Sequence, residues 1–417
     1  MPLGSELIAN FAVIMIVAGA VTFVFYWLKQ PLVLGYLIAG IIIGPYTPPF
    51  SLISRIDVLN AAADLGVVLL LFGVGLEFPL STLRKAGLKI PIGISAIEIA
   101  LMFAVSFLIG WLLHWSLIES LFLGTALASS STVIIGKVLG DYGRLKELSA
   151  MVMMGVLVAE DLFVVLILSL VTSMGSSDLS LLPGLGWNVL KIVLFMAGTL
   201  IIGFLFIPRI IDRVNFVQRD EVIILIALGM CFGLSFLSNA LGLSLAMGAF
   251  LMGVLIATAK STSRVVSLTS PIKDMFAAMF FVSMGALIDV SQFKVFLIPA
   301  LIVTVMMMAG KILGCGFGAK TFGYDTSTSL KVGLGMGQIG EFAFIVAKAG
   351  QDLNLVGPTF FPIIGVAAAL TAFTTPYMIK LSFRLAPDFT PFRFPFKERH
   401  TVKIVKPGPP RKPQKEK

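Results

Sequence analysis

Charged residues are scarce in this 417-residue chain, where Asp, Glu, Lys and Arg together make up 13% of the sequence. Soluble domains carry roughly 25%. Histidine and cysteine are rarer still, and the two residues of each kind, His114, His400, Cys231 and Cys315, are far apart in the sequence. So few side chains of these types, so widely spaced, argue against a disulfide framework and against a metal centre built on them.

Sequence motifs of nucleotide and hydrolytic chemistry are also missing. The chain has no Walker-type phosphate loop, no H-E-x-x-H pattern and no serine–histidine pair suited to an intramembrane protease. Residues 335–340 match G-x-G-x-x-G, but no predicted strand precedes them, which argues against a dinucleotide site. The net charge of +9 is scattered over short connections and one tail. We therefore expect no enzyme activity, no cofactor and no nucleic-acid partner.

Apolar residues are abundant, at 58% of the chain and a mean hydropathy of +1.00. This composition is typical of an all-α polytopic membrane protein. The apolar segments predict thirteen transmembrane helices, two of which, 31–45 and 275–289, are short for a full crossing. The others are 7–28, 61–79, 91–113, 117–139, 149–174, 188–208, 221–239, 242–260, 294–318, 328–349 and 358–380.

Positive charges predict the orientation of these helices. The connections rich in Lys and Arg, and the C-terminal residues, all fall on one side of the membrane under this count. Since basic loops favour the cytoplasm, we expect the N-terminus outside and the C-terminus in the cytoplasm. The basic residues of these connections are Arg84, Lys85, Lys89, Arg144, Lys146, Arg209, Arg213, Arg219, Lys260, Arg264 and Lys273.

The chain divides into a transmembrane domain, residues 1–380, and a tail, residues 381–417. The tail is basic and proline-rich, so we expect it to be disordered in the cytoplasm and weakly attracted to anionic membrane lipids. It is too short for a soluble nucleotide-binding domain.

Two adjacent acids, Glu160 and Asp161, lie near the middle of the predicted span 149–174. A carboxylate at the bilayer centre costs at least ~2.5 kcal/mol, and such residues usually mark a functional site. Lys311, deep in the span 294–318, is equally costly and needs a partner. We predict that Glu160 pairs with Lys311 and leaves Asp161 for substrate. The alternative for Lys311 is that its ammonium reaches the membrane surface.

Two predicted spans, 117–139 and 328–349, are interrupted rather than smoothly helical. The first carries Ser129, Ser130, Ser131 and Thr132 at mid-depth, and the second carries four glycines between residues 333 and 340. They are the fifth and the twelfth predicted spans, seven positions apart, so they run in opposite directions. Interrupted spans at matching positions of two halves predict inverted repeats with a substrate site at the midplane. Ordinary packing of small residues is the alternative.

Three further polar residues lie in or near the spans. Gln338 and Glu341 belong to the second interrupted span. Glu77 ends a predicted span near the cytoplasmic face, where an interfacial structural role is expected. Glu98 lies within the span 91–113, and the sequence assigns it no role.

Six segments in order resemble the Kef/Nap-type monovalent cation:proton antiporters, the cation:proton antiporter-2 family, across residues 10–380. They are 34–45 (LGYLIAGIIIGP), 69–78 (LLLFGVGLEF), 130–132 (SST), the Glu160–Asp161 pair, 280–286 (FFVSMGA) and 338–344 (QIGEFAF).

This resemblance implies a sodium/proton antiporter-like fold, a homodimer with a moving core, and a place in the cell membrane of a prokaryote. It implies that Asp161 binds the cation, with Ser130, Ser131 and Thr132 on one crossing helix and Gln338, Gly340 and Glu341 on the other. Lys311 corresponds to the core lysine of the sodium-type members.

The chain also departs from the family pattern. At the acid pair this chain has Glu-Asp, where the Kef pattern is Gln-Asp and the sodium-type pattern is Asp-Asp. In the second crossing motif, Ile339 replaces the second glycine of the Kef pattern. The transported ion is therefore expected to be Na⁺ or K⁺, exchanged for H⁺ as the cation and the proton compete for one carboxylate. A sodium-coupled solute symporter and a cation channel on a similar fold are the alternatives.

Overall fold

The computed structural model describes residues 3–28, 30–47, 52–53, 56–77, 89–175, 182–217 and 219–386. These residues are helical, apart from the connections, and the described ranges contain no strand. Most of the predicted tail, residues 387–417, lies outside the described residues, as do Arg84 and Lys85. The last helix continues to Leu385, five residues past the predicted domain boundary.

The first half of the chain runs from an N-terminal helix to the helix that carries the acid pair. Its helices are α1 (Leu3–Trp27), α2 (Leu32–Ile43), α3 (Ile56–Glu77), α5 (Lys89–Leu113), α6 (Leu117–Leu127), α7 (Thr132–Asp141) and α8 (Leu148–Gly175). The second half contains α9 (Leu182–Asn215), α10 (Asp220–Ala240), α11 (Leu245–Ile256), α12 (Thr262–Ala286), η1 (Val290–Gln292), α13 (Phe293–Thr321), α14 (Thr326–Met336), α15 (Phe342–Asp352) and α16 (Phe360–Leu385).

The predicted spans correspond to this order of helices. Ten helical segments of the described chain are long and apolar enough to cross a membrane, while α2 and α11 are shorter apolar helices and α14 with α15 makes one broken crossing. One predicted boundary is wrong: the span 275–289 is the end of α12, which has 25 residues. Arg264, Lys273 and Asp274 in its first part lower the local hydropathy and hide the helix from the sequence pattern.

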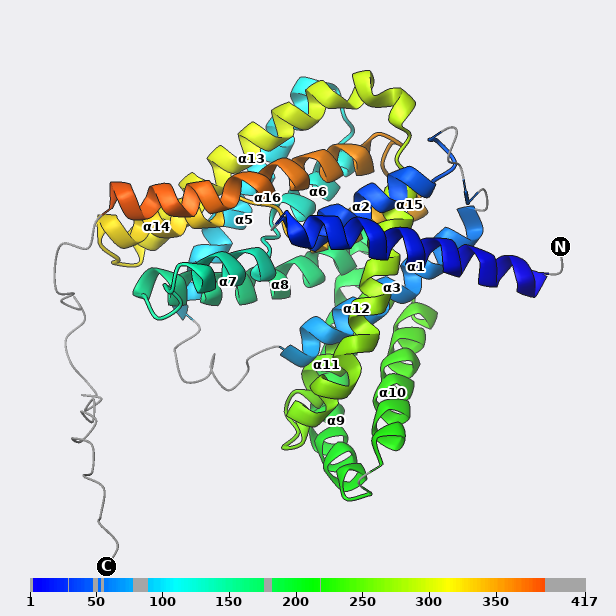
Figure 1. The fold of residues 1–417 in the computed structure, drawn as a ribbon. Coiled ribbons are helices and arrows are strands. Elements are labelled where there is room, and N and C mark those ends of the chain that lie inside the picture. Colours follow the sequence, from blue (N-terminus) through cyan, green and yellow to red (C-terminus); the bar gives the residue numbers. More distant parts are fainter. Residues whose placement is uncertain are drawn as a thin grey trace, which may run out of the picture.

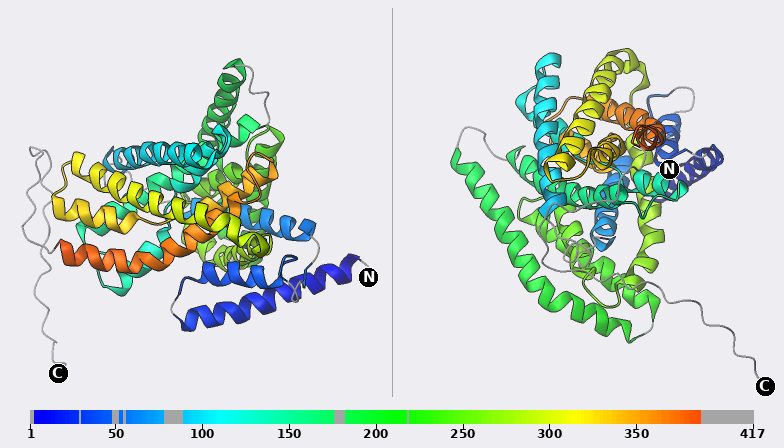
Figure 2. Two further views of the ribbon diagram at one scale, coloured as in Figure 1. Left: turned by 90° about the horizontal axis from the view of Figure 1, so that it is seen from above. Right: turned by 90° about the vertical axis from the view of Figure 1, so that its left-hand side faces the viewer.

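The helices form two bundles (Figures 1 and 2). In the flanking bundle, α1–α3 and α9–α12 are held together mainly by α12 against α2 and α3, and by α11 against α3. The crossing bundle consists of α5–α8 and α13–α16. Its central helix is α13, which packs on α5, α14 and α16. The two interrupted helices, α6–α7 and α14–α15, both belong to the crossing bundle.

The packing repeats between the two halves of the chain. In the flanking bundle, the contact of α2 with α12 corresponds to the contact of α11 with α3. In the crossing bundle, α5 packs on α6 and α8, and its counterpart α13 packs on α14 and α16. Since the matching helices are an odd number of crossings apart, the halves run in opposite directions. This arrangement confirms the predicted inverted repeat.

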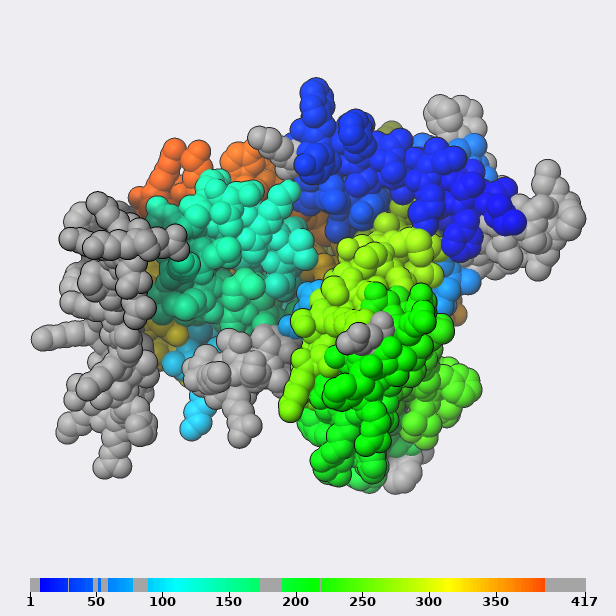
Figure 3. Space-filling view, turned by 60° about the horizontal axis from the view of Figure 1, so that its bottom comes forward, coloured from blue at the N-terminus to red at the C-terminus, as the bar shows by residue number. Residues whose placement is uncertain are grey.

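Helices α1 and α9 lie at the edge of the molecule, where α9 forms part of the green surface in the space-filling view (Figure 3). Only 17% of the apolar stretch of α1 and 11% of that of α9 is buried. Large apolar side chains such as Ile201 and Phe206 are exposed on α9. In a membrane protein, such faces contact lipid or another protein chain.

Candidate functional site

The two interrupted helices break at the same place in the crossing bundle. Helix α6 ends at Leu127 and α7 begins at Thr132, while α14 ends at Met336 and α15 begins at Phe342. The two connecting segments, one in each interrupted helix, are in direct contact: the Gly340 N–H donates a hydrogen bond to the Ser129 carbonyl at 2.9 Å. The predicted pair of crossing helices is therefore present, with both breaks buried.

Gln338 joins the two breaks through its side-chain amide. The Ser131 N–H donates to Gln338 Oε1 at 3.0 Å, and Gln338 Nε2 donates to the Ser131 carbonyl at 3.3 Å. The side chain thus satisfies the Ser131 N–H, which no helix ladder serves, and gives the Ser131 carbonyl a second donor beside the Ile135 N–H at 3.3 Å. Gln338 is fully buried, so these bonds are shielded from water.

Gly340 is required by the close approach of the two chains. A Cβ atom on this residue would lie 2.6 Å from both the carbonyl carbon and the oxygen of Ser130. Contacts below 3.0 Å with backbone atoms force the chain to move. The glycine at this position of the second break therefore lets the first break lie directly against it.

Four helix ends meet at the crossing. The N-termini of α7 and α15 carry partial positive charge, and the C-termini of α6 and α14 carry partial negative charge. Ser131 caps α7 by accepting a hydrogen bond from the Ile134 N–H at 3.3 Å. The remaining polar backbone groups at such breaks can face an ion.

The acid pair lies on α8, in the interior of the protein. Glu160 is fully buried and Asp161 is 8% exposed, so neither carboxylate is exposed to lipid. Lys311 on α13 is also fully buried, which excludes the alternative that its ammonium reaches the membrane surface. The three charged groups predicted from sequence therefore share one polar interior.

Lys311 has a carboxylate on each side. Its ammonium lies 3.7 Å from Glu160 Oε2, as the predicted pairing requires, but only 3.1 Å from Glu98 Oε1. It also donates a hydrogen bond to Ser130 Oγ at 2.7 Å, which ties it to the first break. Glu98 is fully buried on α5, and sequence reasoning missed its place in the site. A lone acid within an apolar span was the signal for it.

Asp161 is the buried acid of this cluster that forms no ion pair with a described residue, whereas Glu98 and Glu160 both lie beside Lys311. Its Oδ1 is buried and accepts no hydrogen bond from the described residues. The charged groups that act on it are the carboxylates of Glu341 and Glu160 and the ammonium of Lys311. A buried carboxylate oxygen without a donor is suited to a cation or a proton as its partner.

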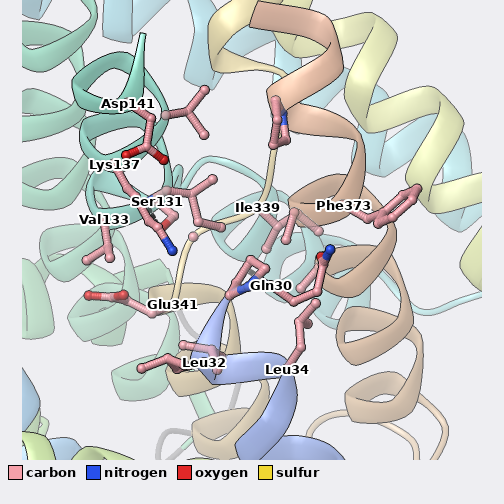
Figure 4. A pocket seen from close by; sticks show the side chains of 18 of the residues that line it. Gln30, Leu32, Leu34, Ser131, Val133, Lys137, Asp141, Ile339, Glu341 and Phe373 are labelled. Carbon is pink, nitrogen blue, oxygen red and sulfur yellow. Dashed lines mark hydrogen bonds between the residues drawn. The ribbon is translucent and has the colours of Figure 1, made fainter. Parts of the chain in front are cut away.

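A cavity of about 510 Å³ reaches the crossing from one side (Figure 4). Ser131, Ile339, Gly340 and Glu341 line it at the breaks. Its walls come from α7, α16 and the start of α2, and they are mostly apolar. The polar residues among the others are Gln30, Lys137, Asp141, Tyr142 and Tyr377.

On the opposite side of the crossing, an ion pair joins the two bundles. Lys348 on α15 is almost fully buried, and its ammonium lies 3.3 Å from Asp64 Oδ1 on α3 as well as against Asp352 on its own helix. Glu77 and Lys273 form a further pair at 2.9 Å, between α3 and α12. This second pair agrees with the structural role expected of Glu77.

Of the hydroxyl residues predicted at the first break, Ser130 and Ser131 are buried and Thr132 is the first residue of α7. Ser129, whose carbonyl bonds Gly340, has a buried hydroxyl with no hydrogen-bond partner among the described residues. The structure thus gathers the predicted site residues from the two breaks, α8 and α13, together with Glu98 from α5, into one region of the crossing bundle.

Comparison with known proteins relates most of the chain to one family of transporters. Residues 12–382 match the family model described as sodium/hydrogen exchanger, transmembrane. The chain is 33% identical over 363 residues to the Na(+)/H(+)-K(+) antiporter GerN of Bacillus cereus, covering 85% of this chain and 91% of that protein.

Two further proteins extend the comparison. The chain is 30% identical over 381 residues to K(+) efflux antiporter 5 of Arabidopsis thaliana, covering 90% of this chain and 66% of the plant protein. The solved structure of the sodium proton antiporter MjNhaP1 from Methanocaldococcus jannaschii superposes with a TM-score of 0.71 at 18% identity, covering 93% of this chain and all of that one. At this identity, the structural likeness concerns the fold.

Proposed function

The chain belongs to the sodium/hydrogen exchanger family, and we propose that it exchanges a monovalent cation, Na⁺ or K⁺, for protons across a membrane. It is a multi-pass membrane protein with inverted repeats. The observation that carries the proposal is Asp161, a buried carboxylate next to two broken helices that has no hydrogen-bond donor on Oδ1 and, unlike Glu98 and Glu160, no ion pair with a described residue.

Asp161 is the group that the cation and the proton occupy in turn. A cation and a proton each neutralise one negative charge, and a single buried carboxylate does not hold both well at once. Hydroxyl and carbonyl oxygens are the ligands that hard monovalent cations prefer. Ser130, Ser131 and Thr132 at the first break, with Glu160 beside Asp161, supply such oxygens near the carboxylate.

The second break supports the site from the other half of the chain. Gln338 and Gly340 hold the two breaks together through three hydrogen bonds to Ser129 and Ser131. Glu341 both lines the cavity and acts electrostatically on Asp161. We assign it to the path between the cavity and the site, where its charge attracts a cation.

The exchange follows from alternating access. The cavity lies among residues at the cytoplasmic ends of α7 and α16 if the N-terminus is outside, as the basic connections favour. In the same orientation, the Lys348–Asp64 pair lies in the outer half and joins the bundles there. The structure then corresponds to a state open to the cytoplasm and closed outside.

Movement of the crossing bundle against the flanking bundle would expose the site to the other side. If the bundle moves when Asp161 is neutralised by either ion but not when it is charged and empty, each cycle exchanges one species for the other. The protein would do this in the cell membrane of a prokaryote, as a homodimer that uses an exposed apolar face of the flanking bundle.

Replacing Asp161 tests this proposal. Asp161→Asn keeps the size of the side chain and removes its charge, so we expect it to abolish cation-dependent proton flux in vesicles. Asp289→Asn, the same change at a partly exposed residue before η1, is the matched control and should exchange normally. Flux at the normal rate in a folded Asp161→Asn variant would contradict the assignment.

A further inference from the structure

We propose that Glu98 is the counter-ion that holds Lys311 in place, and that Glu160 is thereby left to attract the transported cation to Asp161. In this scheme Glu98 is a positioning residue that acts through Lys311. The first half of the proposal concerns the pairing of buried charges alone. The second half rests on the proposed exchange function.

The distances favour Glu98 over Glu160 as the partner. Lys311 Nζ is 3.1 Å from Glu98 Oε1 and 3.7 Å from Glu160 Oε2, and only the first separation is within the normal range for a charge-assisted contact. All three side chains are fully buried. A buried ammonium gains most from the nearest carboxylate, because the interaction weakens with distance and is little screened there.

The backbone also fixes Glu98 beside Lys311. Gly310, Gly314 and Gly318 lie at four-residue spacing along α13, on the face that meets α5. A Cβ on Gly314 would lie 3.1 Å from Glu98 Cα, so the glycine lets the backbone of α5 approach α13 at this residue. Glu98 therefore reaches Lys311 from a closely packed neighbouring helix.

Helix α8, which carries Glu160, is held at a different point of the same cluster. Ser95 Oγ on α5 shares its one hydrogen between the Val156 carbonyl on α8 at 3.1 Å and the Pro91 carbonyl of its own helix at 2.9 Å, about one turn before Glu98 and Glu160. This bond places the two acids on neighbouring helices with Lys311 near both. The hydrogen bond from Lys311 to Ser130 Oγ then fixes the ammonium next to the first break.

Which acid pairs with Lys311 decides how much negative charge remains near Asp161. One ammonium faces two buried carboxylates, Glu98 and Glu160, while Asp161 follows Glu160 in the chain. If Glu98 compensates Lys311, the carboxylate of Glu160 still contributes its charge to the site at Asp161. If Glu160 compensates Lys311 instead, that contribution is largely cancelled.

A stability cycle tests the pairing without any transport. Lys311→Met leaves both acids without their cation, so we expect the melting temperature of the purified protein to fall. Adding Glu98→Gln should recover most of that loss, while adding Glu160→Gln should recover little. Recovery with Glu160→Gln and not with Glu98→Gln would overturn the pairing, whether or not the protein exchanges cations.

Two single variants keep the pairing testable if Lys311→Met does not fold. Gly314→Ala pushes on Glu98 Cα, whereas Gly316→Ala meets nothing closer than 3.4 Å and is the matched control. We expect the first to lower the melting temperature in a wild-type background but much less in a Glu98→Gln background. Equal losses in both backgrounds would mean that Gly314 acts by packing alone, and would overturn the pairing.

Transport kinetics test the consequence for Glu160. In Glu98→Gln, Lys311 turns to Glu160, and loss of that charge near the cation should raise the apparent KM for the cation on the order of tenfold with little change in kcat. Glu98→Asp should restore part of the affinity. An unchanged KM in Glu98→Gln, with normal exchange at high cation concentration, would refute this role. Absence of all cation exchange in the wild type would instead refute the proposed function.

Discussion

The amide of Gln338 gives the sharpest prediction about the crossing. In Gln338→Ala, the Ser131 N–H and carbonyl lose the partners that now lie at 3.0 and 3.3 Å. Both groups are in a buried break of the helix, where water cannot easily replace the amide. We expect the variant to lose stability and exchange activity together.

The size of the loss follows from the unsatisfied groups. A buried donor or acceptor left without a partner costs about 1–3 kcal/mol. The Ser131 N–H is one such group, whereas the Ser131 carbonyl keeps the Ile135 N–H at 3.3 Å, so we expect a loss of about 1–3 kcal/mol. Gln338→Glu keeps the shape but replaces the donor to the Ser131 carbonyl by a carboxylate oxygen, so we expect it to be at least as damaging.

Thermal unfolding of the purified protein in detergent, together with proton flux in vesicles, measures the effect. Gln351→Ala, in the last turn of α15 and partly exposed, is the matched control and should change neither quantity. A Gln338→Ala protein with the melting temperature and flux of the wild type would refute the view that this amide holds the two breaks together.

Two other predictions concern the glycine at the crossing and a helix cap outside the membrane. Gly340→Ala should lower both the melting temperature and the flux, because its Cβ would meet Ser130 backbone atoms at 2.6 Å, whereas Gly136→Ala on α7, with nothing within 4 Å, should be neutral or slightly stabilising. Equal effects of the two substitutions would contradict the close approach. Partial burial alone would raise the pKa of Asp325, but hydrogen bonds from Thr328 and neighbouring N–H groups outweigh it and hold this pKa below its usual value. Asp325→Ala should therefore destabilise the protein by about 1 kcal/mol at neutral pH. Because the pKa is lowered in the folded state, this difference should shrink only as the pH falls below about 4, and unfolding curves that kept a constant difference down to pH 3 would argue against the charged cap.

The sequence was most informative where one residue type dominates a whole helix. Thirteen apolar segments predicted the order of crossings, and clustered hydroxyl and glycine residues predicted both breaks. These features depend on the residues of one segment alone. The end of α12 was misplaced because its first part is polar, although its helix continues through Arg264 and Lys273.

Contacts between helices were harder to predict. An intramembrane lysine requires a partner, but the sequence does not say which of several buried acids lies nearest. Glu160 was chosen from its place beside Asp161, while the structure puts Glu98 closer to Lys311. That proximity depends on the packing of α5 against the glycines of α13, which the sequence pattern of either helix alone does not reveal.

The most direct test of the central claim is proton flux in proteoliposomes that contain the purified protein. Na⁺, K⁺ and Li⁺ would be added in turn, with and without a clamp on the membrane potential. Exchange through a single buried carboxylate predicts that at least Na⁺ or K⁺ drives proton movement in both directions, with saturation at carrier rates. Proton flux that does not respond to any of these cations, or ion currents with no coupled proton movement, would contradict the account.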